Sequence, residues 1–373
     1  MKHKELFNLL DSVQEQGEEP QLKRHDKVLL IDGLNLFFRN FAMLNMVNPD
    51  GIHVGGLGGF LRSLGALIRQ VQPTSVYVVF DGAGSSTNRK NLLPEYKEDR
   101  NLQRITNWEI FEDVDDEHDA KVDQIVRLIQ YLKLLPVKTI TIDKVEADDV
   151  IAVLSNKLVE KYNSTVFIVS SDKDFVQLVT DKIILYRPME KEYYTPKVIT
   201  EKFGCLSKNF ILYKTLLGDN SDKIPGVKGL GVKGIYKKFP ELQTQNLTLE
   251  DIFDISARKF KEHVVYSRIV HDRNRLETSY KVMDLSIPMI DDNEKEYLDT
   301  VIKSDFPDLH DKLFIQLYNE DKLGGMIRNL EIWLRDNLCI PKGVIHIKED
   351  TSKTTSLTLE SYRTSPEVKL QVE

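Results

Sequence analysis

The chain has 373 residues, of which 41% are hydrophobic and 29% are charged. This composition is ordinary for a soluble globular protein and excludes fibrous proteins and chains dominated by disorder. Because a domain usually takes roughly 100 to 200 residues, the length predicts two or three domains. The formal net charge of −7, from 58 acidic and 51 basic residues, argues by itself against a nucleic-acid partner, because phosphates attract Lys and Arg.

Neither a membrane helix nor a secretory signal is expected. No apolar run approaches the roughly 20 residues that a membrane helix requires, and Val76–Phe80 is typical of the longest runs. Residues 1–20 are too interrupted by charge to form a signal peptide. The two cysteines, Cys205 and Cys339, are far apart and predict neither a disulfide framework nor a zinc site. We therefore expect a cytoplasmic protein with no membrane partner.

The first two thirds of the chain alternate between strand and helix patterns. Residues 1–25 are mostly polar and predict an N-terminal extension. Four short apolar runs, typical of strands buried on both faces of a parallel sheet, then follow at Val28–Ile31, Val76–Phe80, Val137–Ile142 and Val166–Val169. Segments with helical period lie between them at residues 59–70, 122–132 and 150–158. This alternation predicts an α/β domain over residues 26–188, with a mostly parallel sheet flanked by helices.

The β pattern ends at about Pro188, and helical patterns with Gly-rich turns replace it. We expect a second, mainly helical domain over residues 189–350. Residues 351–373 are rich in Ser and Thr and lack periodicity, which predicts a disordered tail.

Acidic residues follow the predicted strands directly. In an open parallel sheet the ligand site lies beyond the carboxyl ends of the strands, so these acids are candidates for chemistry. Further acids open the helix after the third strand and occupy a later Gly-Asp-Asn-Ser-Asp turn. The full set is Asp32, Asp81, Glu146, Asp148, Asp149, Asp172, Asp174, Asp219 and Asp222.

Each of these acids has a structural alternative as a turn residue, a helix N-cap or a complement to the positive end of a helix. Gathered at one rim, however, they would repel one another unless cations intervened. Oxygen ligands without His or Cys suit Mg²⁺ or Mn²⁺, and two such ions can support phosphodiester hydrolysis. Spacing leaves open whether Asp148 or Asp149 contacts a metal, because Glu146 shares a helical face with Asp149 but not with Asp148.

Two basic segments accompany the acids. The first contains Arg89, Lys90 and Pro94–Arg100 and lies in a long polar stretch where no core element is predicted. It is either a solvated charged surface or an arch over the site, in which Lys97 and Arg100 neutralise the scissile phosphate.

The second basic segment runs from Lys223 to Lys238 and contains five lysines and no acid. Its closely spaced glycines precede a helix, where backbone N–H groups can approach a phosphate. The alternative is a flexible loop between helices, but the regular Gly-x-x-Gly-x-Gly spacing favours binding to a DNA backbone.

Six ordered motifs between Val28 and Phe239 resemble the 5′ nuclease family. This family includes the N-terminal domain of bacterial DNA polymerase I, the bacteriophage flap endonucleases and the phage nuclease called ribonuclease H. The motifs are Asp32-Gly33, Asp81-Gly82, Tyr96-Lys97 with Arg100, Glu146–Asp149, Ser171–Asp174, and Gly218–Asp222 followed by Ile224–Gly229. The resemblance implies a PIN-like nuclease domain and a helix-three-turn-helix element at Ile224–Lys238. Residues before Asp26 and after about Ser286 match no motif of the family.

The resemblance also implies a role for each candidate residue. Asp32, Asp81, Glu146 and Asp148 would surround a first metal, and Asp172, Asp174, Asp219 and Asp222 a second, with Asp149 in a less defined role. Lys97 and Arg100 would be the positively charged catalytic residues of the arch. Phe38 would stack on a DNA base, although it is equally suited to a core position. The further expected DNA contacts are Arg89, Lys90, Tyr96, Gly226, Lys228, Gly229, Gly231, Lys233 and Gly234. A K⁺ ion is expected at the helix-three-turn-helix element.

We therefore expect a monomeric Mg²⁺-dependent enzyme that removes 5′ flaps or RNA primers by endonucleolytic and 5′ to 3′ exonucleolytic cleavage. Its partners would be DNA with flaps, nicks or RNA primers, with replication proteins as further candidates. One rival is a DNA-binding module without catalysis, which gains nothing from concentrated negative charge. Another is a single-strand ribonuclease with a similar acidic domain, which leaves residues 218–238 unexplained.

Overall fold

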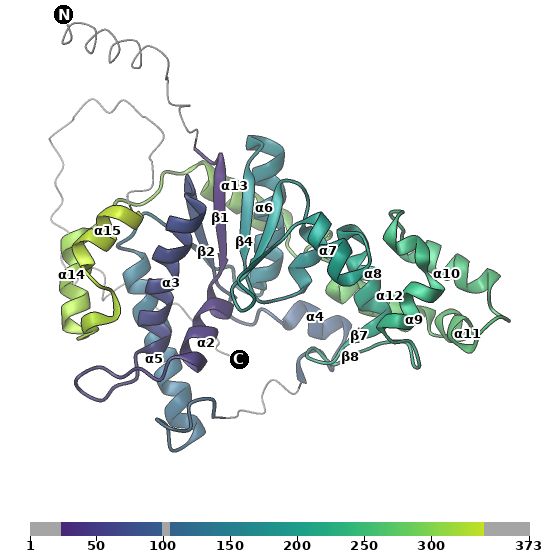
Figure 1. Cartoon of the computed structure of the whole chain (residues 1–373), viewed down its shortest axis with the longest axis horizontal. Helices are drawn as coiled ribbons and strands as arrows, with labels where there is room; N and C mark the ends of the chain where they lie inside the picture. The colour runs from purple at the N-terminus through teal and green to yellow at the C-terminus, as the bar shows by residue number, and fades with distance from the viewer. Residues whose placement is uncertain (1–23, 99–104, 339–373) are drawn as a thin grey trace, which may run out of the picture.

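The computed structural model describes residues 24–98 and 105–338. A six-stranded sheet in the order β3-β2-β1-β4-β5-β6 lies at its centre (Figure 1). The strands are β1 (Lys27–Asp32), β2 (Ser75–Val79), β3 (Lys138–Ile140), β4 (Thr165–Val169), β5 (Ile183–Arg187) and β6 (Glu192–Tyr194). Neighbouring strands are parallel except for β6, which is antiparallel to β5. The predicted α/β architecture with a mostly parallel sheet is confirmed.

The central strand β1 shows why the sheet is covered on both faces. Successive side chains of a strand point to opposite faces. Val28 and Leu30 contribute to the core that contains α6 (Ala147–Tyr162). Leu29 and Ile31 contribute to the core formed with α2 (Gly33–Met43), α3 (Gly55–Val71) and α5 (Val114–Leu132). All four side chains are fully buried, as the continuous apolar run predicts.

The three predicted helices of this domain are confirmed as α3, α5 and α6, and each is longer than its pattern suggested. Helix α3 begins at Gly55 instead of Gly59, because the glycines of its first turns are buried against other segments of the protein. A Cβ at Gly55 would overlap the Leu44 carbonyl, and one at Gly58 would overlap Met326. The glycine run therefore serves close packing.

The remaining elements are mainly helical. The α-helices are α4 (Thr87–Leu92), α7 (Pro196–Phe203), α8 (Phe210–Leu217), α9 (Val232–Lys238), α10 (Leu249–Arg258), α11 (Val264–His271), α12 (Arg273–Met283), α13 (Asp292–Lys303), α14 (Asp311–Glu320) and α15 (Leu330–Leu338). The short 3-10 helices are η2 (Asp174–Leu178), η3 (Ser207–Asn209), η4 (Pro240–Gln243) and η5 (Gly324–Met326). A small antiparallel pair, β7 (Gly218–Asp219) and β8 (Ile224–Pro225), precedes α9. No helix in the described ranges is long and apolar enough to span a membrane.

The predicted domain boundary between residues 188 and 189 falls inside the β5–β6 hairpin, so the sheet extends beyond it. Helices α14 and α15, which the prediction grouped with the helical domain, instead lie beside α3 at the opposite end of the molecule from α9–α11 (Figure 1). Phe314 and Trp333 join the core of α3 and α5. The pattern of an amphipathic helix does not reveal which surface the helix covers. Most of the predicted extension 1–25 and the whole predicted tail 351–373 lie outside the described residues.

Trp333 offers a test of this packing. Its ring lies 5.9 Å from the Phe314 ring, and a Cβ at Gly65 of α3 would overlap it. We expect Trp333→Ala to lower the free energy of unfolding by about 3 kcal/mol, because it leaves a cavity in a shared core. Urea denaturation measures this loss. The neighbouring Ile332 is 45% exposed, so Ile332→Ala should cost less than about 1 kcal/mol. Equal losses for the two variants would contradict the docking of α15.

Candidate active site

The first acids lie where the sequence predicts, at the carboxyl ends of neighbouring strands. Asp32 ends β1, and its two carboxylate oxygens accept hydrogen bonds from the Asn35 backbone (3.1 Å) and the Ser170 hydroxyl (2.9 Å). Asp81 follows β2 and accepts a hydrogen bond from the Ala147 backbone at the start of α6 (2.7 Å). Both acids therefore accept a hydrogen bond from a helix N-terminus. The predicted role at a helix end and the predicted position at the carboxyl end of a strand are thus both present.

The pKa values of these acids indicate that they lie close to one another. Burial, with the charges of Asp81 and Asp172, raises the pKa of Asp32 to about 7. Burial, with the charges of Asp172 and Asp32, raises the pKa of Asp148 well above its usual value. Because like charges disfavour ionisation only at short range, Asp32, Asp81, Asp148 and Asp172 share one neighbourhood.

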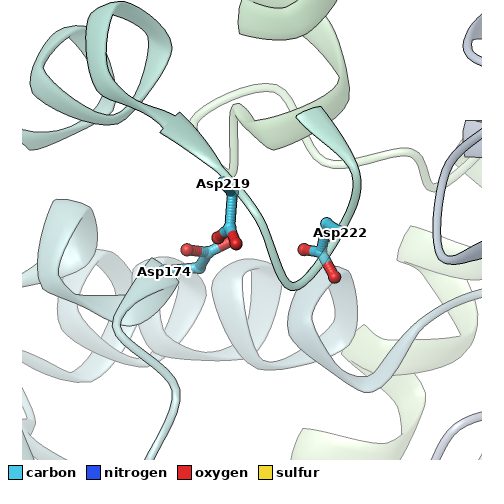
Figure 2. Close-up of side chains that lie close together, drawn as sticks. All are labelled: Asp174, Asp219 and Asp222. Carbon is cyan, nitrogen blue, oxygen red and sulfur yellow. The ribbon is translucent and has the colours of Figure 1, made fainter. Parts of the chain in front are cut away.

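A second group of carboxylates lies beside the first. Asp174 of η2, Asp219 of β7 and Asp222 of the following turn each offer an oxygen within 4.8 Å of the others (Figure 2). Asp172 connects the two groups, since its carboxylate accepts a hydrogen bond from the Asp174 backbone (2.8 Å). Burial, with the charge of Asp172, raises the pKa of Asp174 to about 7. This spacing and an all-oxygen donor set fit a hard divalent cation.

Lys214, which the sequence analysis missed, lies between two of these acids. Its ammonium group contacts Asp174 and lies 2.7 Å from an Asp219 oxygen. Although burial raises the pKa of Asp219, the Lys214 charge outweighs it and lowers that pKa to about 2. Lys214 is the one charged residue of α8, whose sequence is FILYKTLL. A lone lysine in an apolar helix is a signal that could have identified it, because buried lysines require a partner.

A pocket of about 460 Å³ opens at this second group. Asp172, Asp219 and Lys214 line it together with Asn35 and Arg187. Asp172 and Asp219 therefore border a space that cations and a phosphate group can enter.

The segment before the arch differs from the prediction. No core element was expected there, but the structure has α4, and Arg89 and Tyr96 are 3% and 4% exposed. The Arg89 guanidinium lies 2.6 Å from Asp149 and 3.0 Å from Glu146. The Tyr96 hydroxyl donates to Glu146 (3.2 Å). The DNA contact by Arg89 stays a prediction, while in this structure buried carboxylates of α6 engage its charge.

Lys97 lies beside the acids, as expected of a residue of the arch. Its ammonium group lies 2.9 Å from the second Glu146 oxygen, and its backbone N–H donates to the Asp222 carbonyl (3.3 Å). Although burial raises the pKa of Glu146, Arg89 and Lys97 together lower it. Lys90 is half-buried, and Arg100 lies outside the described residues.

Asp148 and Asp149 have different surroundings. The Asp149 carboxylate accepts hydrogen bonds from both Arg89 terminal nitrogens (2.6 and 3.1 Å) and from the Met289 backbone (3.0 Å). For Asp148, burial and the charges of Asp172 and Asp32 raise the pKa instead. Arg89 therefore holds Asp149, whereas the charges that affect Asp148 are those of the neighbouring acids, a distinction that spacing alone left open.

The predicted DNA contacts after β8 lie on turns and on α9. Lys228, Gly229, Gly231 and Lys233 are exposed, while Gly226 and Gly234 are half-buried. Gly226 has a packing requirement, because a Cβ there would overlap the Leu217 carbonyl. Gly229 has a φ of 80°, which favours glycine. Phe38 is half-buried and packs edge-on against Phe37 with ring centroids 5.6 Å apart.

Comparisons with known proteins show which family the chain resembles. A family profile described as "5'-3' exonuclease, N-terminal resolvase-like domain" matches residues 27–204. A 5′-3′ exonuclease of Buchnera aphidicola is 30% identical over 272 residues, which are 71% of this chain and 89% of that protein. A 5′-3′ exonuclease of Bacillus subtilis is 32% identical, covering 61% of this chain and 74% of that protein. DNA polymerase I of Bacillus subtilis is 34% identical over 63% of this chain, but only 26% of that longer protein is matched.

Among solved structures, the bacteriophage T5 D15 flap endonuclease in complex with DNA and metal ions has a TM-score of 0.55 and 21% identity. The match covers 79% of this chain and 99% of that one, and it confirms the predicted PIN-like nuclease fold. The family profile, the two 5′-3′ exonucleases and the fold agree, and the chain belongs to the 5′-3′ exonuclease family.

Proposed function

We propose that this protein is a structure-specific 5′ nuclease that hydrolyses phosphodiester bonds with two Mg²⁺ ions. Its substrates would be 5′ flaps and RNA primers on DNA during replication. One observation carries the proposal: acids from positions 32 to 222 lie near one another, and burial together with repulsion from neighbouring carboxylates raises the pKa of Asp32 and Asp174 to about 7. Bound cations would offset this repulsion, and such a rim suits phosphodiester chemistry.

The proposed ligands follow the two groups of acids. Asp32, Asp81 and Asp148 would hold the first ion, with Glu146 at its edge, and Asp174, Asp219 and Asp222 the second, with Asp172 between them. Mg²⁺ is proposed over softer metals because all donors are carboxylates, and Mn²⁺ is a plausible substitute. When bound, such ions lower the pKa of a water ligand and stabilise the leaving oxygen.

The chain's own basic residues would orient the substrate. Lys97, held by Glu146 at the rim, would neutralise charge that develops on the scissile phosphate, together with Arg100. Lys214 would keep Asp174 and Asp219 at fixed positions in the absence of substrate.

DNA would be held away from the cut by the turns before α9. Exposed Lys228 and Lys233 and the backbone around Gly229 suit binding of phosphates without sequence preference, and a K⁺ ion is proposed there. We propose α7–α12 as the DNA-binding unit. That the protein acts as a cytoplasmic monomer alongside replication proteins stays a prediction.

Incubation of the full chain with an end-labelled 5′-flap duplex tests the proposal. We expect cleavage near the flap junction in Mg²⁺ and none in EDTA, because the carboxylates alone activate no water. DNA binding without products in Mg²⁺ or Mn²⁺ would favour a binding module. Faster cleavage of unstructured RNA than of flap DNA would favour a single-strand ribonuclease. Either result would overturn the proposal.

A further inference from the structure

Arg89 joins three elements around the first turn of α6. Its Nε donates to the Val282 carbonyl near the end of α12 (2.9 Å), and its terminal nitrogens bind Asp149 of α6. The same guanidinium lies 3.0 Å from Glu146. One side chain of α4 therefore connects the segment before the arch, the acid-bearing helix and the helical region.

The two acids that Arg89 contacts lie on either side of Asp148 in sequence. Glu146 is the N-cap residue of α6, but its side chain makes no capping hydrogen bond. Its oxygens are instead held by Arg89, Tyr96 and Lys97. With Glu146 and Asp149 both anchored, the first turn of α6, which carries Asp148 between them, has little freedom to rotate.

Arg89 also balances charge where solvent is excluded. The side chains of Arg89, Glu146 and Asp149 are 4%, 2% and 1% exposed. Removing one partner of a buried ion pair leaves an uncompensated charge, which neighbouring groups must move to relieve. Without Arg89, the Asp149 carboxylate would retain only the Met289 N–H among these partners, and the turn that carries Asp148 would be the nearest part to shift.

We infer that Arg89 is a positioning residue for metal binding: it sets the orientation of Asp148 through Glu146 and Asp149, and it makes no contact with DNA. This inference rests on the proposed two-metal function. It predicts that loss of Arg89 weakens the affinity for the divalent cation and leaves the affinity for DNA nearly unchanged. Groups that orient metal ligands typically contribute about 10-fold to 100-fold in metal affinity.

The test compares Arg89→Gln and Arg89→Lys with the unaltered chain. We expect Arg89→Gln to raise the Mg²⁺ concentration for half-maximal flap cleavage by about 10-fold or more, with KM for DNA changed by less than about twofold. Arg89→Lys retains the charge but cannot make two parallel hydrogen bonds to one carboxylate. Its Mg²⁺ requirement should therefore lie between those of the unaltered chain and Arg89→Gln. A titration of Mn²⁺ binding without DNA, followed by electron paramagnetic resonance, should show the same order.

Arg127→Gln is the matched control. Arg127 makes a comparable paired contact with Asp321, which also accepts from Tyr131, but it joins α5 to the end of α14. This variant should lose stability without a change in Mg²⁺ dependence. The inference is overturned if Arg127→Gln weakens metal binding equally, or if Arg89→Gln raises KM for DNA at unchanged Mn²⁺ affinity. An unaltered chain that binds Mn²⁺ but cuts nothing would reject the proposed function, while Mn²⁺ binding would still decide the role of Arg89.

Discussion

Asp172→Asn should lower the rate of flap cleavage by about 1000-fold or more while leaving DNA binding intact. Asp172 lies between the two groups of acids, since its charge affects the pKa of Asp32, Asp148 and Asp174. The amide has the same shape and can still accept the Asp174 N–H, so the fold should persist. What is lost is one negative charge that would bind both cations, and losses of about 4 kcal/mol in transition-state stabilisation correspond to such a rate change.

Single-turnover cleavage and a separate binding assay in Ca²⁺ would measure the two effects. Asp299→Asn is a suitable control, because Asp299 on α13 pairs with Lys157 and Lys161 and not with the acids at the rim. Its cleavage rate should stay within about twofold of the unaltered chain, as is usual for substitutions away from a site. Retention of full activity by Asp172→Asn would refute the proposed arrangement of ligands.

Mg²⁺ should stabilise the protein much more at about pH 8 than at about pH 5. The pKa values of Asp32 and Asp174 are raised to about 7 in the folded, metal-free chain, chiefly by burial and neighbouring carboxylates. Protonation of these two carboxyls therefore favours the folded state, so the stability that they contribute is fully present below about pH 4 and is lost as the pH rises through about 7. Each of the two carboxyls should contribute up to about 4 kcal/mol to this loss, since one pKa unit corresponds to about 1.4 kcal/mol.

Cation binding should replace the lost protons. At about 100 times its dissociation constant, Mg²⁺ adds about 3 kcal/mol, which should raise Tm by about 5 to 10 °C at about pH 8. At about pH 5, protons compete with Mg²⁺ and the rise should be small. Asp219 has a pKa lowered to about 2, so its opposite effect falls below about pH 4, outside this window. Thermal unfolding with and without Mg²⁺ measures the rise in Tm at each of the two pH values.

Asp148→Asn separates this explanation from general ion binding. Because the pKa of Asp148 is raised by burial and by Asp172 and Asp32, its neutral replacement should stabilise the metal-free chain at about pH 8. The same substitution should reduce the rise in Tm on adding Mg²⁺. A variant that is less stable without metal, or an equal Mg²⁺ effect at both pH values, would show that repulsion among the acids is not the cause.

The sequence by itself determined the strands and helices of the α/β domain. It also determined that the acids lie at the carboxyl ends of the strands. Strand and helix periods are local, so Val28–Ile31 and the helix after Glu146 could be identified without knowledge of their partners. Parallel strands bring their carboxyl ends to one edge, and for this reason Asp32 and Asp81 could be placed together before any coordinates existed. The order of the motifs sufficed to indicate the family.

Only the tertiary structure decided which side chains meet. Asp148 and Asp149 differ by one position in the same helix, and their surroundings diverge because Arg89, 60 residues from Asp149 in sequence, binds one of them. The packing of α8 against η2 places Lys214 beside Asp174. Helix α15 packs against α3 and not against the helical region that is closer to it in sequence. Contacts of this kind depend on how distant surfaces fit together and exclude water, and no local pattern in the chain encodes them.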